Sequence, residues 1–249
     1  MSESPSIQVR ALSTVSEFAQ AVEVQKQVWD FHEIELVPVH LFNVASHIGG
    51  QTFGAYDGDR MVGFLLAIPG LKPGGRFYLH SHMLGVLKEQ RNRGVGRMLK
   101  LRQREEALAR GITLIEWTFD PLEIKNAHFN IERLGAVVRR YVLNQYGATS
   151  NPLHGGLPTD RCVAEWWLEH PRVASLLLGM PRKRPVIAAR IPVPADIAEI
   201  RGNEPARARE IQKRISDQFL ECFGRGLAVV AFERSDAAGT YLLGPWQSE

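Results

Sequence analysis

Two hydrophobic periods alternate along the first 170 residues, a period of two that is typical of strands and a period of three to four that is typical of helices. The period of two predicts strands at residues 7–12, 52–56, 61–68, 77–86, 112–119, 136–146 and 161–168. The longer period, bounded by capping residues, proline or glycine, predicts helices that end near residues 29 and 49 and helices at 94–110 and 122–134. This order predicts an α/β (α+β) domain over residues 1–170, with a mixed central sheet and flanking helices.

A second, shorter set of elements follows. Residues 171–185 begin and end with proline and are expected to form a linker. The pattern then predicts a strand at 186–191, a helix at 204–225, a strand at 227–233 and a hairpin arm at 241–243. We therefore expect a C-terminal accessory β-α-β-β segment over residues 171–249, packed on the first domain or across a homodimer.

Charge and composition narrow the class of partner. Lys and Arg number 30 against 27 Asp and Glu, and they are spread along the chain, which is too mild a balance to indicate nucleic-acid binding. The first ten residues hold no apolar core of signal-peptide length, and no apolar run approaches the roughly 18 residues of a membrane span. The two cysteines match no disulfide framework or zinc spacing, and no histidine pair has a third ligand near it in sequence. We expect a cytoplasmic protein without a metal.

A glycine turn between the strand at 77–86 and the following helix carries the clearest chemical signal. It reads Arg91-Asn92-Arg93-Gly94-Val95-Gly96, and backbone N–H groups at such a helix start bind anions. A dinucleotide fingerprint needs glycine or alanine where Leu99 stands, and a P-loop needs a Gly-Lys-Ser/Thr triplet that the chain lacks. The remaining pattern is R-x-x-G-x-G at the start of a helix.

That pattern resembles the pyrophosphate loop of the GNAT superfamily of acyl-CoA N-acyltransferases, and the order of predicted elements resembles that fold. Asn126, Ala127, Phe129 and Leu134-Gly135 are similar to the family's second helix motif. The resemblance implies that acetyl-CoA, or another acyl-CoA, is the co-substrate, with Asn126 and Phe129 beside its thioester. It also implies that backbone groups of Leu84 and Val86 hold the pantetheine arm. The residues implied to hold the pyrophosphate are Arg91, Asn92, Arg93, Gly94, Val95, Gly96 and Arg97.

Two histidines are the candidate bases. His80 and His82 are two residues apart in the predicted strand, and a strict period of two places them on the face shared with Leu84 and Val86. The tract is similar to the arylalkylamine N-acetyltransferase branch, in which a histidine pair serves proton transfer. Hydrogen-bonded core histidines are the alternative.

The general acid is less clear, because many family members carry a tyrosine where this chain has Ile131. Tyr141, Tyr146, Asn130 or a water molecule remain candidates. Four acidic residues near the expected site could attract a cationic amine or could be solvated surface groups: Glu33, Glu35, Asp120 and Glu123.

The sequence thus predicts an N-acetyltransferase that acylates a small-molecule or peptide amine. Since neither cysteine stands out as a nucleophile, we expect direct attack by the amine in a ternary complex. The alternative is a non-catalytic acyl-CoA-binding or regulatory module, which Ile131 and the accessory segment leave open.

Overall fold

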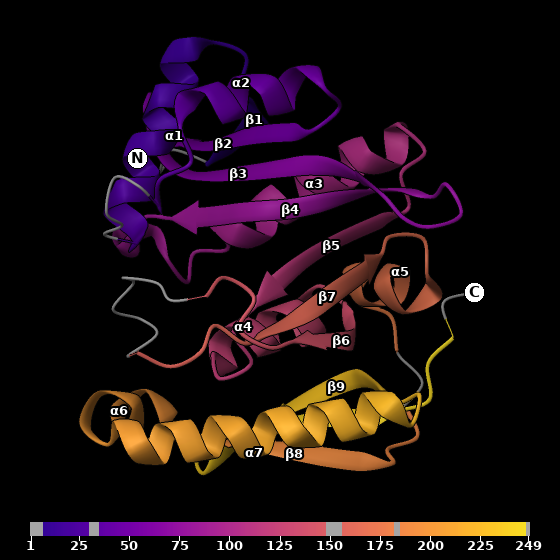
Figure 1. The fold of residues 1–249 in the computed structure, drawn as a ribbon. Helices are drawn as coiled ribbons and strands as arrows, with labels where there is room; N and C mark the ends of the chain where they lie inside the picture. The colour runs from indigo at the N-terminus through magenta and orange to yellow at the C-terminus, as the bar shows by residue number, and fades with distance from the viewer. Residues whose placement is uncertain (1–6, 30–34, 148–155, 182–184, 248–249) are drawn as a thin grey trace, which may run out of the picture. The chain divides into compact units, whose positions relative to one another are not determined.

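The computed structural model describes residues 7–29, 35–147, 156–181 and 185–247 (Figure 1). The chain divides into two compact units, one ending at Ile115 and the other beginning at Glu116.

The first unit is an antiparallel β-meander covered by helices. Its elements are β1 (Gln8–Ala11), α1 (Val15–Trp29), α2 (Val39–His47), β2 (Gln51–Asp57), β3 (Arg60–Leu71), β4 (Phe77–Val86), a 3-10 turn η2 (Lys88–Gln90) and α3 (Val95–Ala109). The strands pair in chain order, β1 with β2, β2 with β3 and β3 with β4, all antiparallel. The strand predicted at 77–86 has the predicted bounds.

Burial on both faces of this meander explains the nearly continuous apolar run of β3, and all but the last residue of β2 are also buried. On one face, Phe42 of α2 packs against Phe64 of β3, with ring centroids 5.8 Å apart. On the other face, Val95 and Leu99 of α3 are almost fully buried. Helices therefore cover both faces of the sheet, which positions the start of α3 beside the end of β4.

The second unit holds the remaining elements. These are β5 (Leu114–Phe119, whose first two residues belong to the first unit), α4 (Ile124–His128), a π-helical turn η3 (Phe129–Arg133), β6 (Val137–Val142), β7 (Arg161–Trp167), α5 (Pro171–Leu177), β8 (Ala189–Pro194), α6 (Ile197–Asn203), α7 (Pro205–Gly224), β9 (Ala228–Arg234) and β10 (Ala238–Gly244). Its strands lie in the order β5-β7-β6-β9-β10-β8. The predicted α/β class is confirmed.

Three predictions about the helices of this unit are wrong. The expected linker contains α5, because His170 caps the helix by accepting a hydrogen bond from the Arg172 N–H and Pro171 occupies the first turn. The expected helix at 122–134 begins at Ile124 and changes to a π-helical turn at Phe129. The segment after β8 contains α6 as well as α7, so its order is β-α-α-β-β.

The C-terminal segment joins the sheet of its own chain. Val229 of β9 pairs with Val138 of β6, and β10 lies between β9 and β8. The division of the chain into domains at residues 1–170 and 171–249 stays a prediction.

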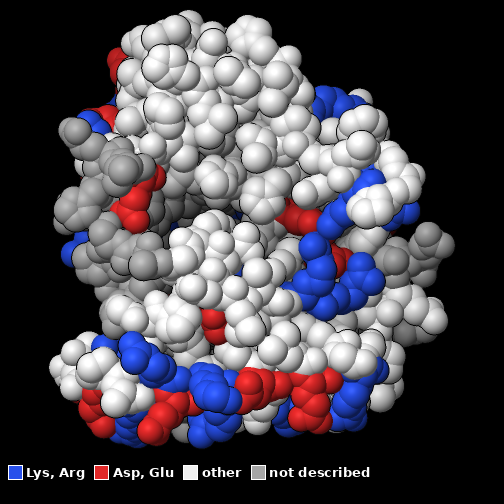
Figure 2. Space-filling model, in the orientation of Figure 1, with Lys and Arg blue, Asp and Glu red and all other residues white. Residues whose placement is uncertain are grey.

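The exposed face of α7 is a solvated surface. Figure 2 shows it as a band of alternating basic and acidic side chains, which include the ion pairs Arg207–Glu204 and Lys213–Asp217. Neighbouring charges of opposite sign on a helix stabilise it modestly and leave no single-sign field. Within the described part of the chain, no helix is both long and apolar enough to cross a membrane.

Candidate functional site

The turn that precedes α3 has the backbone geometry of an anion site. Asn92 and Gly94 both adopt positive φ, 64° and 83°, and Gly94 is the N-cap residue of α3. No side chain caps this helix, and its first turn contains no acidic residue. Because the first N–H groups of a helix have no acceptor within it, those of α3 are available to a ligand.

Hydrogen bonds hold this turn against the β2–β3 hairpin. The Leu87 N–H donates to the Val62 carbonyl at 2.9 Å, and the Gln90 amide donates to Asp57 at 3.2 Å. The Arg93 guanidinium donates in turn to the Gln90 side-chain carbonyl at 2.5 Å. The turn is therefore fixed before any ligand arrives, which lowers the ordering cost of binding.

The predicted pyrophosphate residues differ in what they contact. The exposed side chain of Arg91 donates from Nε to the Val86 carbonyl at 3.3 Å. Val86 is one of the two residues predicted to hold the pantetheine arm through backbone groups, and its carbonyl accepts this hydrogen bond here. Gly96 faces β4: a Cβ added there would lie 3.5 Å from a Leu84 methyl group. Arg97 is half-buried. The turn, the end of β4 and the start of α3 thus form one continuous structure.

A β-bulge interrupts β4 at His82. Ser81 pairs with Ala67 and Met83 pairs with Leu66, two consecutive residues of β3, so His82 is the extra residue. A bulge shifts the alternation of side chains by one position. Bulges of this kind are common next to active sites.

The bulge overturns the predicted arrangement of the two histidines. Cross-strand partners point to the same face, and this pairing puts His80 with Met83 and Gly85, on the face opposite Leu84 and Val86. The expectation that His80 shares a face with Leu84 and Val86 is therefore wrong, because a strict period of two does not hold through a bulge.

The two histidines nevertheless lie near each other, with ring centroids 6.1 Å apart. The His82 imidazole reaches solvent, while the protein around it partly removes its hydration and lowers its pKa below the ordinary value of 6.5. A neutral imidazole at neutral pH can accept a proton, which is the state that a general base needs.

A buried polar group next to the bulge was not predicted. Lys100 of α3 is nearly inaccessible, and its Nζ donates to Ser81 Oγ at 2.8 Å and to Gln103 Oε1 at 3.1 Å. Burial lowers the pKa of Lys100 well below its ordinary value. The position of Lys100 beside Leu99 and three residues before Gln103, on the buried face of α3, could have predicted its burial.

In the second unit, the residues predicted to lie beside the thioester are on α4 and η3. Asn126 is exposed and Phe129 is half-buried. The Leu134 N–H donates to the Phe129 carbonyl at 3.1 Å, which is the wider spacing of a π-helical turn and recurs at functional sites. Ile131 is completely buried, so the position where the family often has tyrosine faces the core here.

The candidate acids separate by burial. Tyr141 is buried, and its hydroxyl lies 2.9 Å from Ser216 Oγ and 3.3 Å from Asp160. Burial raises the pKa of Tyr141 strongly. Asn130 is also buried, whereas Tyr146 is half-exposed and its hydroxyl lies 2.7 Å from Thr118 Oγ1 of β5. Tyr146 is thus the accessible tyrosine of the pair.

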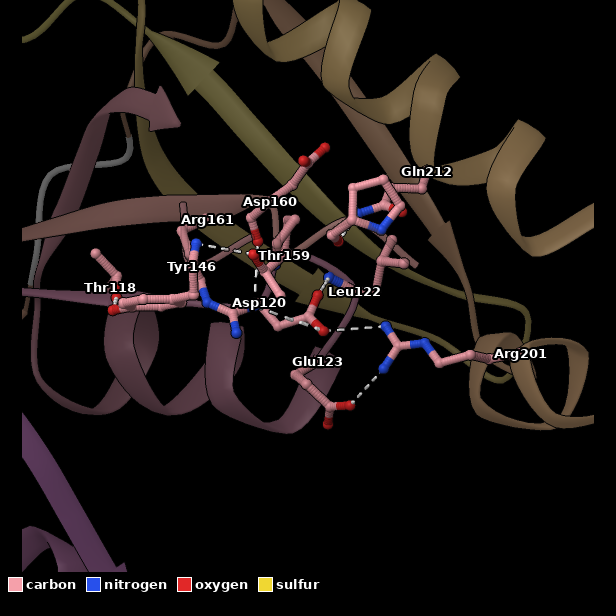
Figure 3. A network of polar contacts seen from close by, with 12 residues as sticks. Thr118, Asp120, Leu122, Glu123, Tyr146, Thr159, Asp160, Arg161, Arg201 and Gln212 are labelled. Carbon is pink, nitrogen blue, oxygen red and sulfur yellow. Dashed lines mark hydrogen bonds and ion pairs between the residues drawn. The ribbon is translucent and has the colours of Figure 1, made fainter. Parts of the chain in front are cut away.

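Two of the four predicted acidic residues share one arginine. Asp120 and Glu123 flank the turn between β5 and α4, and both bind the guanidinium of Arg201 (Figure 3). Glu35 lies in the first unit, and Glu33 lies outside the described residues. Asp120 therefore serves a buried ion pair and not a free cation site.

The cysteines are poor nucleophiles. Cys162 and Cys222 are buried, and burial raises the pKa of both thiols. Among the residues that the structure describes, no cluster of three or more His, Cys, Asp or Glu side chains could hold a metal ion.

Comparison with known proteins gives one family match over part of the chain. A model of the Acetyltransferase (GNAT) family matches residues 16–136. A search of curated proteins found no matching sequence.

Solved structures share the fold at low sequence identity. An acetyltransferase of the GNAT family from Streptococcus pneumoniae is 15% identical, with a TM-score of 0.53 over 64% of this chain and 98% of that one. The ribosomal-protein-S18-alanine N-acetyltransferase from Escherichia coli is 14% identical, with a TM-score of 0.52 over 66% of this chain and 96% of that one. Arabidopsis thaliana Naa50, in complex with the bisubstrate analogue CoA-Ac-MVNAL, is 16% identical, with a TM-score of 0.51 over 64% of this chain and 97% of that one.

These likenesses confirm the predicted fold, with its mixed sheet and flanking helices. The family match covers β4, the glycine turn and the second helix motif. Residues 16–136 of this chain match the model of the Acetyltransferase (GNAT) family.

Proposed function

We propose that this chain transfers an acetyl group from acetyl-CoA to an amine, by direct attack of the amine in a ternary complex. The observation that carries the proposal is the start of α3, where Gly94 in the left-handed region leads into a helix with no side-chain cap and no acidic first turn. Within a GNAT domain, this geometry suits a pyrophosphate.

The residues present fit that group in charge as well as shape. Arg91, Arg93 and Arg97 surround the turn, and the helix dipole favours an anion by about 0.3–1 kcal/mol. Each hydrogen bond to a charged phosphate oxygen contributes about 1.5–3 kcal/mol. Glycine at 94 leaves open space where a Cβ would stand, so a phosphate can approach the backbone closely.

The reaction requires a base for the ammonium, attack of the free amine on the thioester, and protonation of the thiolate that leaves. In our proposal the His82 imidazole takes a proton from the ammonium of the acceptor, and the freed amine attacks the thioester carbonyl carbon. A C–N bond forms and the C–S bond breaks. The attacking nitrogen loses its second proton to water as the amide forms, and the departing thiolate takes a proton from Tyr146 or from water. The exposed imidazole with a lowered pKa supports His82 as the base.

A covalent acetyl-enzyme is not part of the proposal. Both cysteines are buried with raised pKa values, so neither supplies a thiolate at neutral pH. Direct attack needs only that the amine and the thioester be held together.

The acceptor class that we propose is a primary amine on a small molecule or a peptide. The Escherichia coli relative is named for N-acetylation of an alanine of protein S18, and the Naa50 structure holds an analogue that joins CoA to the sequence MVNAL. At this level of identity, those acceptors suggest compounds for a panel and do not select one.

The function is tested by thiol release from acetyl-CoA in the presence of polyamines, arylalkylamines, aminoglycosides and short peptides. We expect at least one amine to accelerate thiol release well above the rate without acceptor, with a matching N-acetylated product by mass spectrometry. Calorimetry should first establish binding of acetyl-CoA. Tight binding with no turnover across the panel would favour the non-catalytic acyl-CoA-binding module instead.

A further inference from the structure

We propose that Arg201, on α6 of the C-terminal segment, is a positioning residue for the proposed reaction. In this proposal Arg201 fixes the turn between β5 and α4, and so fixes α4 with Asn126 and η3 with Phe129. The inference rests on the proposed function and on the expectation, implied by the family resemblance, that these two residues lie beside the thioester.

The Arg201 guanidinium bridges the two ends of that turn. One terminal nitrogen, Nη2, lies 3.1 Å from Asp120 Oδ2, and the other, Nη1, lies 3.4 Å from Glu123 Oε1 (Figure 3). The Leu122 N–H donates to Asp120 Oδ1 at 2.8 Å, so the same carboxylate also shapes the turn. Only 8% of the Arg201 side chain is exposed, and a buried arginine held by two carboxylates has little freedom to move.

Other parts of the C-terminal segment hold the same stretch of chain. The Tyr241 hydroxyl of β10 donates to the Pro121 carbonyl at 2.7 Å, and the Phe232 N–H of β9 donates to Glu132 Oε1 at 2.9 Å. A Cβ added at Gly239 would lie 2.8 Å from a side-chain carbon of Ile124, so β10 approaches α4 closely. Residues 120–132 therefore rest on α6, β9 and β10.

The length of α4 makes this support necessary. It spans five residues, and isolated helices shorter than about 12 residues are marginal in water. Its order must therefore come from tertiary contacts. Asp120 also lies 4.0 Å from Arg161, and Arg201 binds the carboxylates of both Asp120 and Glu123.

This support lies outside the matched family region. The family match ends at residue 136, and the structures above align with about two thirds of this chain. The C-terminal segment thus supplies the guanidinium that joins the ends of the turn. Its role in this proposal is to support the thioester side of the site.

The test compares Arg201→Met with Arg190→Met in the full chain. Arg190 is in the same segment and forms an exposed ion pair with Glu233 at 2.8 Å, so it controls for loss of an arginine. We expect Arg201→Met to lower kcat about 10- to 100-fold, because small displacements near a reacting group cost this much. It should also speed amide hydrogen exchange across residues 120–133. Arg190→Met should change neither.

Two further measurements separate positioning from a general loss of structure. Binding of 3′,5′-ADP, a probe without the thioester arm, should stay within about twofold in Arg201→Met, whereas acetyl-CoA should bind more weakly. Arg201→Lys, which keeps the charge but not the two-pronged contact, should recover part of kcat and part of the exchange protection. Lost binding of both ligands in both variants would show a general structural role and overturn the proposal.

Unchanged kcat and unchanged exchange in Arg201→Met would also overturn it. If the unmodified protein turned over no amine, the proposed function would fail by itself. The difference between acetyl-CoA and 3′,5′-ADP binding, together with the exchange rates, would then decide the positioning role.

Discussion

Valine in place of Gly94 is expected to raise the dissociation constant for acetyl-CoA by about 100-fold or more. Gly94 has φ of 83°, a region that costs a residue with a Cβ roughly 1–2 kcal/mol, and a β-branched side chain also blocks the approach of a phosphate. Losing two hydrogen bonds to phosphate oxygens, at about 1.5–3 kcal/mol each, accounts for the fold-change. Isothermal titration calorimetry measures it.

Gly111→Val is the matched control. Gly111 follows the other end of α3, has φ of 71° and, like Gly94, has open space where a Cβ would stand. Both variants therefore carry a similar backbone strain, and a similar fall in the unfolding midpoint is expected. Normal affinity in Gly111→Val with weak binding in Gly94→Val locates the site. Equal affinities in the two variants would remove the pyrophosphate from this turn.

Replacement of His82 by alanine is expected to lower kcat by about 10²- to 10⁴-fold, the usual contribution of a general base. Acetyl-CoA affinity should change little, because the imidazole acts on the acceptor amine. A stopped assay of N-acetylated product, with the best amine of the panel, measures the loss. His40→Ala, at an exposed position of α2, is the control histidine variant and should keep full activity.

The pH dependence of kcat/KM is a second test of His82 as the base. Because desolvation lowers the pKa of His82, the imidazole is neutral at pH 7 and becomes a cation only in more acid solution. The value of kcat/KM should therefore fall as pH drops through an apparent pKa below 6.5, and this acid limb should vanish in His82→Ala. Full turnover in His80→Ala/His82→Ala would exclude both histidines from proton transfer.

The elements around the proposed site follow from local sequence patterns. The strand at 77–86 has apolar residues on both sides of the polar stretch at 80–82. Gly94, followed by apolar residues at helical spacing, marks the start of α3. The bulge at His82 could not be predicted in this way, because it depends on the register between β4 and β3. A one-residue slip reverses the faces of every later side chain, and this slip separated His80 from Leu84.

The C-terminal half shows the same division between local and long-range information. The start of α5 could be predicted, since Pro171 suits a first helical turn, but the further prolines at 181 and 185 favoured a linker. The contact of Arg201 with Asp120 joins residues 81 positions apart. No periodicity or motif in the sequence predicts such a contact, so the role proposed for α6 could be inferred only from the folded structure.

The central claim, that the start of α3 binds the pyrophosphate of CoA, is tested most directly by amide chemical shifts. Protein labelled with nitrogen-15 is titrated with CoA, with 3′,5′-ADP and with pantetheine, which lacks the phosphates. We predict that the amides of Gly94, Val95 and Gly96 shift with CoA and not with pantetheine. The claim is contradicted if CoA binds at saturation while those three amides stay in place.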